Sequence, residues 1–194
     1  EKPFWLKALV IHAQGGSCFQ FSFSVIPSVL CRAHCAMGIL KGINPLLTAD
    51  LLHILRDMGH GDKLCICDCN FPASECATKT TTGKKVELAC DLPTALDAIC
   101  EVLPLDFFVD APALHMSPQA GAELPPAGAE VTALIKAAIS KHCPDVEAAP
   151  CDRFAFYEQA RSSFAIVQCL ERRPYGNAVL TKGVVGPDGR DLKP

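Results

Sequence analysis

The fold of this chain is decided by residues 58–72, which read Met58-Gly59-His60-Gly61-Asp62-Lys63-Leu64-Cys65-Ile66-Cys67-Asp68-Cys69-Asn70-Phe71-Pro72. Two glycines flank His60 and allow the backbone to turn sharply there. The apolar residues that follow predict a short strand over 63–69.

Polar groups accompany this strand. Side chains alternate in direction along a strand, so we expect Asp68 and Asn70 on one face and Cys67 and Cys69 on the other. We expect the imidazole of His60 close to the carboxylate and the amide. Such a set can move protons on a polyhydroxylated substrate.

The composition is that of a globular protein. The chain has 194 residues, of which 49% are hydrophobic and 20% charged, and its net charge is −3. This length suffices for one domain with a core, with or without an appendage. No basic run is present, which argues against general nucleic-acid binding. No apolar stretch is long enough to span a bilayer, so we expect no membrane partner. We also expect a cytoplasmic location.

Twelve cysteines would suit a disulfide framework in a secreted protein. However, Cys65 and Cys67 stand beside ordinary apolar residues of the predicted strand, and reduced cysteine packs as a small hydrophobe. The same holds for the cysteines that lie within other apolar patterns, Cys90, Cys100 and Cys169. We therefore predict reduced, buried thiols rather than disulfides.

A soft-metal site is the alternative reading of the strand cysteines. Cys65, Cys67 and Cys69, with Cys76 and His60, could supply ligands. Their alternate spacing lacks the C-x-x-C pairs of structural zinc sites, and no second paired motif follows. We therefore predict neither a metal nor a cofactor.

Residues 1–36 differ from the rest of the chain. They hold an apolar run from Phe19 to Leu30, and Met37 follows them. We interpret them as an N-terminal extension, being a leader peptide, upstream sequence or residues added for expression, with the domain at 37–194. The lack of a basic segment before the apolar run favours upstream sequence, with Met37 as the initiator, over a signal peptide.

Helical and strand patterns alternate after residue 44. Spacing and caps predict helices over 49–58, 94–103, 131–142 and 152–161. Strands are expected over 63–69, 86–89, 107–109, 164–169 and 177–182, and a mobile loop over 117–129. This alternation predicts a single layered α/β domain.

The C-terminal part supplies further polar candidates. Arg153 and Tyr157 are four residues apart on a predicted helix, so they share a face. Tyr175 and Asn177 are two apart and point the same way in an extended chain. With His60, Asp68 and Asp106 these residues offer both donors and acceptors, which suits the hydroxyls of a sugar.

Each candidate also has an ordinary structural reading. His60 could be a solvated loop residue, and Arg153 with Tyr157 an exposed helix face. Tyr175 and Asn177 could simply close a turn. Asp68 is the least ordinary of the set, because a carboxylate on an apolar strand needs partners.

Several motifs together resemble the L-fucose mutarotase and D-ribose pyranase family, over residues 39 to about 185. They are Leu40-Lys41-Gly42-Ile43, Met58-Gly59-His60-Gly61-Asp62, Asp68-Cys69-Asn70-Phe71-Pro72-Ala73, Leu103-Pro104-Leu105-Asp106, Arg153-Phe154-Ala155-Phe156-Tyr157-Glu158 and Tyr175-Gly176-Asn177. The Asn70-Phe71-Pro72-Ala73 segment favours the fucose type over the ribose type.

The resemblance implies an isomerase that interconverts the α and β anomers of L-fucose without cofactor or metal. It implies His60 as general acid, Asp68 as a sugar ligand, and functional roles for Asp106, Arg153, Tyr157, Tyr175 and Asn177. We expect Tyr157 or Tyr175 to carry the opposite proton transfer, and Asp68, Asp106, Arg153 and Asn177 to bind sugar hydroxyls. The resemblance further implies a homo-oligomer with sites shared between subunits, in which the Tyr175-Gly176-Asn177 turn reaches into a neighbour's pocket. The alternatives are a D-ribose pyranase and a non-catalytic sugar- or metal-binding protein.

Overall fold

The structure, a computed structural model, describes residues 38–194. Its helices are α1 (Ala49–Asp57), α2 (Ala73–Ala77), α3 (Leu92–Cys100), α4 (Pro126–His142) and α5 (Arg153–Arg161). Its strands are β1 (Lys63–Cys67), β2 (Lys85–Leu88), β3 (Ala113–Ser117), β4 (Ala149–Asp152), β5 (Ala165–Cys169) and β6 (Ala178–Thr181). The extension predicted at residues 1–36 lies outside the described residues. Within residues 38–194, no helix has the length and apolar character needed to cross a bilayer.

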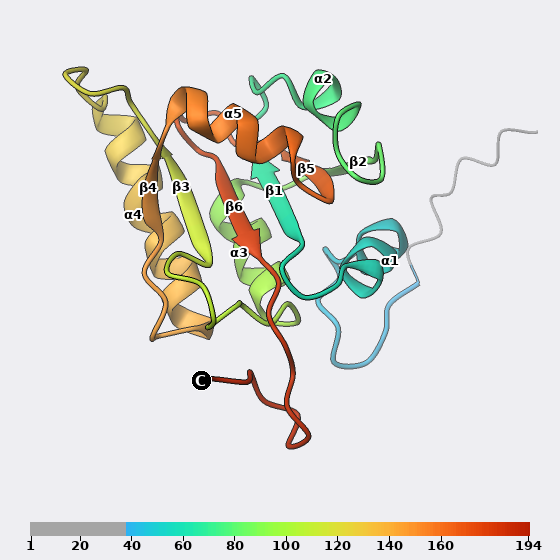
Figure 1. Ribbon diagram of the computed structural model, residues 1–194. Helices are drawn as coiled ribbons and strands as arrows, with labels where there is room; N and C mark the ends of the chain where they lie inside the picture. Colours follow the sequence, from blue (N-terminus) through green and yellow to red (C-terminus); the bar gives the residue numbers. More distant parts are fainter. Residues whose placement is uncertain (1–37) are drawn as a thin grey trace, which may run out of the picture. The chain divides into compact units, whose positions relative to one another are not determined.

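The six strands form one mixed sheet in the order β2-β5-β1-β6-β3-β4 (Figure 1). The pairs β2–β5, β5–β1 and β3–β4 are parallel, whereas β6 is antiparallel to both of its neighbours. The carboxyl ends of the other five strands therefore share one edge of the sheet. The amino end of β6 lies at that same edge, and its carboxyl end lies at the opposite one.

Helices cover both faces of the sheet, which confirms the predicted layered α/β domain. Leu64 and Ile66 of β1 face a core that includes α1, α3 and α4. Cys65 and Cys67 face a second core with α2 and α5. Because side chains alternate in direction along β1, its aliphatic residues face one core and its cysteines face the other.

Capping residues fix where the predicted helices begin. Thr48 accepts a hydrogen bond from the Leu51 N–H at the start of α1. Asp91 accepts one from the Thr94 N–H at the start of α3. Such caps satisfy backbone donors that the helix itself leaves free.

The sequence-based boundaries were wrong in the middle of the chain. Residues 107–109 form a turn, and the strand of this region is β3 at Ala113–Ser117. The predicted loop over 117–129 ends early because α4 begins at Pro126, a residue that suits the first turn of a helix. Helix α2 and strand β4 were not predicted.

Candidate sugar-binding site

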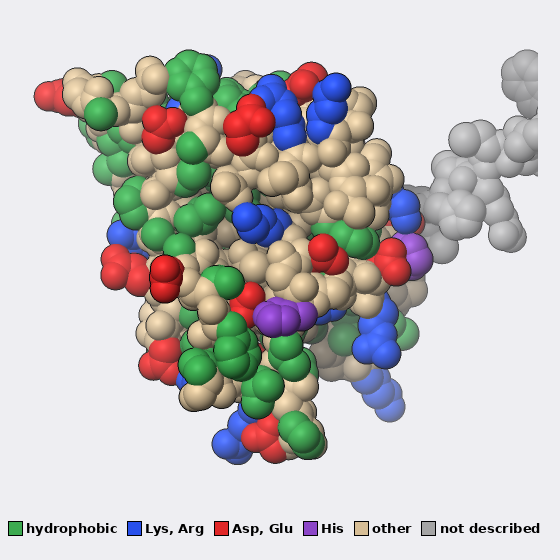
Figure 2. All heavy atoms as spheres, viewed as in Figure 1, with side chains coloured by type: hydrophobic (Ala, Val, Ile, Leu, Met, Phe, Trp, Pro, Cys, Tyr) green, Lys and Arg blue, Asp and Glu red, His purple; other side chains and the backbone are tan. Residues whose placement is uncertain are grey.

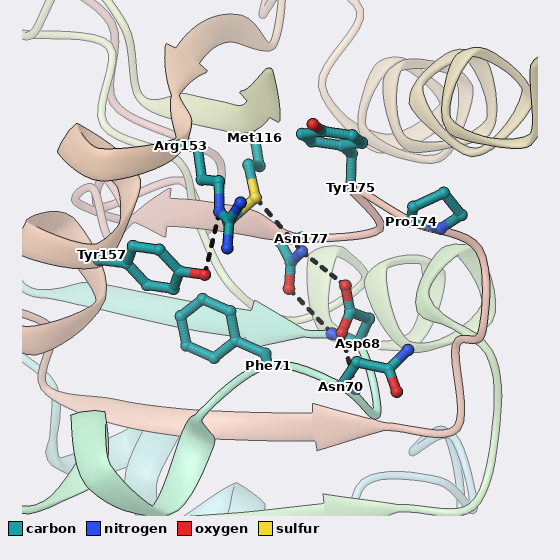
Figure 3. A pocket seen from close by; sticks show the side chains of 9 residues that line it. All are labelled: Asp68, Asn70, Phe71, Met116, Arg153, Tyr157, Pro174, Tyr175 and Asn177. Atoms are coloured by element: carbon teal, nitrogen blue, oxygen red, sulfur yellow. Dashed lines mark hydrogen bonds between the residues drawn. The ribbon is translucent and has the colours of Figure 1, made fainter. Parts of the chain in front are cut away.

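A cavity of about 270 Å³ opens at the edge where β1 ends and β6 begins (Figure 3). Its volume is close to the lower limit of ligand pockets, roughly 300 Å³. The side chains that line it come from the segment after β1, from β3, from α5 and from the turn before β6: Asp68, Asn70, Phe71, Met116, Arg153, Tyr157, Pro174, Tyr175 and Asn177. Five of the seven predicted site residues therefore meet in one place.

Asp68 and Asn177 form the polar floor of this cavity. The Asn177 amide donates to Asp68 Oδ2 at 2.8 Å, and its Oδ1 accepts the Asp68 backbone N–H at 2.9 Å. Asp68 Oδ1 accepts the Asn70 N–H at 2.8 Å. Burial raises the pKa of Asp68, while the hydrogen bond from Asn177 acts against that rise. The carboxylate is thus fixed in direction and poorly hydrated, as a group that binds a hydroxyl should be.

Helix α5 presents Arg153 and Tyr157 to the cavity from consecutive turns, as their spacing predicted. The Arg153 Nε–H donates to the Tyr157 hydroxyl oxygen at 3.3 Å. The Tyr157 ring stacks on Phe71, with centroids 5.3 Å apart and an angle of 29° between the planes. At the helix start, Asp152 accepts the backbone N–H groups of Phe154 and Ala155. The aromatic stack and the cap together hold the phenol at the cavity wall.

The turn that carries Tyr175 is built on a buried carboxylate, Glu171. Both oxygens of Glu171 accept from the Arg173 guanidinium, at 2.8 and 2.7 Å. Burial alone would raise the pKa of Glu171, but these bonds and backbone N–H groups lower it to about 2. Gly176 is required because a Cβ there would meet the Glu171 side chain. Tyr175 itself has φ +64°, a left-handed conformation that non-glycine residues seldom adopt.

His60 and Asp106 are not in this cavity. His60 precedes β1 and Asp68 follows it, and a strand of five residues separates its ends by roughly 16 Å. At the distant edge, His60 Nε2 lies 3.1 Å from Asp106 Oδ1; the His60 side chain is 50% exposed and that of Asp106 only 2%. The expectation that His60 and Asp68 stand close together in one chain was wrong, because an intervening strand holds them apart.

The Tyr175-Gly176-Asn177 turn lies against the cavity of its own chain. Asn177 is bonded to Asp68 of its own chain, and Tyr175 lines the same cavity. Within one chain the turn therefore lines its own cavity, and its reach into a neighbour's pocket stays a prediction.

The strand cysteines do not converge with His60. Cys65 and Cys67 are buried beneath α2 and α5, whereas Cys69 is exposed beyond the strand end. The pKa of the Cys67 thiol is raised, first by its hydrogen bond with Cys65 and second by burial. Among residues 38–194, no three His, Cys, Asp or Glu side chains are grouped as metal ligands. On the face shown in Figure 2, charged side chains of both signs are scattered rather than gathered.

Comparison with known proteins identifies the family. Residues 41–185 match the model of the RbsD / FucU transport protein family. This chain belongs to that family. The family membership predicted from the motifs is therefore confirmed.

Individual RbsD / FucU family members differ in their similarity to this chain. A fucose mutarotase of Danio rerio is 38% identical over 159 residues, which cover 78% of this chain and 98% of the relative. The fucose mutarotase of Streptococcus pneumoniae, solved in complex with L-fucose, has a TM-score of 0.66 at 32% identity, covering 76% of this chain and all of that one. Bacillus subtilis RbsD, solved in complex with D-ribose, has a TM-score of 0.58 at 20% identity over 76% of this chain and all of that one, which shows the shared fold alone.

Phe71, Met116 and Glu171 were not predicted as parts of this site. Phe71 was noticed only as part of a motif, although its ring supports Tyr157. Met116 receives a weak hydrogen bond at Sδ from the Asn177 amide, at 3.7 Å. A single methionine or glutamate carries no spacing signal, so the sequence offered no means of selecting either residue.

Proposed function

We propose that this protein is an L-fucose mutarotase, an isomerase that interconverts the α and β anomers of L-fucose. The observation that carries the proposal is the cavity in which a clamped carboxylate, a guanidinium and two phenols surround a volume suited to one monosaccharide. The relatives named fucose mutarotase support the choice of sugar, since they are far more similar to this chain than RbsD is.

Anomer exchange requires two proton transfers. The anomeric hydroxyl loses its proton while the ring oxygen gains one, and the bond between C1 and the ring oxygen breaks. The free aldehyde end then rotates, and the ring closes on its other face with both protons returned. Holding the sugar in one orientation makes these transfers efficient, and we assign that role to Asp68, Arg153 and Asn177.

Tyr157 is the better placed of the two tyrosines to take the anomeric proton. Its oxygen accepts the Arg153 Nε–H at 3.3 Å, and the guanidinium carbon lies 5.8 Å from the ring centroid. To take this proton the Tyr157 side chain must react as the phenolate, and a fixed cation beside its oxygen stabilises that form; the phenolate becomes a neutral phenol as the anomeric proton arrives. Tyr175 has no such cation bonded to it among the described residues.

The acid role falls to His60, which must then come from a second copy of the chain. His60 lies at the opposite edge of its own sheet from the cavity, and half of its side chain is exposed. A homo-oligomer that joins the two edges would bring the imidazole of one subunit to the cavity of the next. The contact is heterologous, because the two surfaces differ.

Two further expectations belong to this proposal. We place the protein in the cytoplasm, where reduced thiols persist. Six of the nine cysteines within residues 38–194 are buried free thiols, consistent with that compartment. We assign no cofactor to the reaction, since imidazole, phenol and carboxylate suffice for both transfers.

Saturation-transfer NMR on the anomeric protons tests the activity directly. Wild-type protein should accelerate exchange of L-fucose more than that of D-ribose, and Asp68→Ala should abolish the acceleration. Equal exchange with and without protein for both sugars would overturn the proposal.

Mixing two inactive variants tests the shared site. His60→Ala and Asp68→Ala should each be inactive, but subunits mixed through unfolding and refolding should regain activity. In an equal mixture, about a quarter of the contacts pair an intact histidine with an intact cavity. A mixture that stays inactive, although each variant assembles, would place His60 and the cavity in one subunit.

A further inference from the structure

We propose that Asp106 is a positioning residue that holds the His60 imidazole at Nε2 and leaves Nδ1 as the nitrogen that exchanges a proton with the sugar. This inference rests on the proposed mutarotase function. It replaces the sequence-based assignment of Asp106 as a sugar ligand.

The surroundings of Asp106 leave it one ionisable partner. Its side chain is 2% exposed, and its Oδ1 lies 3.1 Å from His60 Nε2. The same oxygen accepts the Phe108 backbone N–H at 3.0 Å, which fixes the direction of the carboxylate. Within residues 38–194, no lysine or arginine forms an ion pair with Asp106. A buried carboxylate needs a compensating partner, and the His60 imidazole is the one within ion-pair distance of it.

The end of β6 and the two residues after it, Thr181–Gly183, form a brace: backbone hydrogen bonds from this segment hold the chain beside His60 and at Asp106. The Asp106 N–H donates to the Thr181 carbonyl at 3.1 Å, and the Gly61 N–H donates to the Lys182 carbonyl at 2.8 Å. Lys182 returns a bond, from its N–H to the Asp62 carbonyl at 2.8 Å. The histidine turn and the aspartate turn are thus attached to consecutive residues of one backbone segment.

Gly183 allows the brace to lie directly against the backbone of residues 104–106. Its N–H donates to the Pro104 carbonyl at 2.8 Å. A Cβ at residue 183 would run into the backbone carbonyl of Leu105, so only glycine fits. The brace therefore depends on a specific backbone contact and not on side-chain packing alone.

Phe108 limits the remaining freedom of the imidazole. Its ring meets that of His60 at 69°, with centroids 6.0 Å apart. The carboxylate contact and this edge contact together restrict rotation of the His60 ring. The Nδ1 atom has no hydrogen-bond partner among the described residues, so it remains available to a ligand.

The carboxylate at Nε2 selects one form of the neutral ring. Neutral imidazole carries one N–H, and a carboxylate at Nε2 favours the proton there, which leaves the Nδ1 lone pair free. In the protonated ring, the Nδ1–H bond breaks as the bond between that proton and the sugar ring oxygen forms. On ring closure the proton returns to Nδ1. The Nε2–H bond and the ionised Asp106 stay unchanged throughout.

Long-range ¹H–¹⁵N NMR of protein labelled at histidine nitrogen tests the tautomer without any sugar. We expect wild-type His60 in the Nε2–H form at a pH where the ring is neutral. Asp106→Asn can accept from Nε2–H or donate to Nε2, so its spectrum should show a tautomer mixture. Wild-type His60 in the Nδ1–H form would overturn the proposal, whatever the activity of the protein.

Kinetics separate positioning from sugar binding. We expect Asp106→Asn to lower kcat by ~10–100-fold, the effect typical of removing an orienting partner, with KM unchanged. Asp110→Asn is the control, because this exposed acid is close in sequence and makes no ion pair in the described residues. A rise in KM with kcat unchanged would mean that Asp106 binds the sugar. A wild-type protein that exchanges no sugar would refute the proposed function, while the tautomer measurement would still decide the role of Asp106.

Discussion

Asn177 holds Asp68 from two sides, donating to its carboxylate at 2.8 Å and accepting its backbone N–H at 2.9 Å. The pair joins the end of β1 to the start of β6 across 109 residues of sequence. The pair therefore links two neighbouring strands and also forms the floor of the cavity. Its two roles predict two separable effects of mutation.

Replacement of Asn177 by alanine should cost stability as well as activity. The variant leaves a buried N–H and a carboxylate oxygen of Asp68 without a partner, at about 1–3 kcal/mol. Urea unfolding should show this loss, and calorimetric titration should show weaker L-fucose binding. Asn70→Ala is the control for stability, because Asn70 has an exposed side chain beside the same cavity. Equal stability of Asn177→Ala and wild type would mean that water replaces the amide.

The two tyrosines should respond differently to loss of their hydroxyls. Tyr157→Phe keeps the ring stacked on Phe71 and removes only the group that is bonded to Arg153. If Tyr157 takes the anomeric proton, kcat should fall by ~10²–10⁴ with little change in melting temperature. Tyr175→Phe should have a smaller effect on kcat. The reverse order of the two kcat values would transfer the base role to Tyr175.

Acid should weaken the turn before β6 through Glu171. The pKa of Glu171 is lowered from 4.5 to about 2 in the folded protein, so its contribution is complete above pH 4.5 and is lost as the pH falls toward 2. The contribution is at most about 3 kcal/mol. Chemical unfolding at several pH values should show this dependence. Glu171→Gln should be less stable than wild type at pH 7, and the difference should shrink toward pH 2. A constant difference would assign the effect to packing rather than charge.

Gly183→Ala should disturb the His60 side of the molecule and leave the cavity unchanged. The added methyl group meets the Leu105 backbone carbonyl, so a backbone shift costing about 1–3 kcal/mol is expected. NMR chemical shifts should change at His60 and Asp106, while L-fucose binding should persist. Gly38→Ala, where a Cβ meets no atom within 4 Å, is the control. Shift changes confined to residue 183 and its chain neighbours would show that the brace tolerates a side chain.

The sequence predicted the outer elements of the domain better than its middle. Helices α1 and α5 follow Thr48 and Asp152, whose side chains cap them, and both caps are visible in sequence. Helix α3 begins at Leu92 after the cap Asp91, two residues before the predicted start at Thr94. Strand β3 was missed because His115 stands in its centre and its burial is not strictly alternating. Strand β4 was missed because it contains Pro150, which lacks the backbone N–H that a central strand needs. β4 is the outermost strand of the sheet, where proline is tolerated.

The sequence predicted the residues that line the cavity better than it predicted the position of His60. Arg153 and Tyr157 share a helix face, as their spacing of four predicted. Tyr175 and Asn177 line the cavity together, but the extended conformation assumed for them was wrong: Tyr175 has φ +64° and its carbonyl accepts the Asn177 N–H at 2.8 Å. His60 and Asp68 are only eight residues apart, yet they lie at opposite edges because the residues between them are extended. Nearness along the chain predicts nearness in space for a helix or turn, but not across a strand.

The reversed strand β6 limits which insertions and deletions this fold can tolerate. Its four residues connect Asn177 at one edge with the Lys182–Gly183 brace at the other. Losing or gaining one residue within β6 would turn its side chains to the wrong face and shift one end against the other. The cavity and the histidine turn would then fail together, although neither had been altered. Length variation among descendants of this gene should therefore spare residues 177–183 and collect in the connection between β3 and α4.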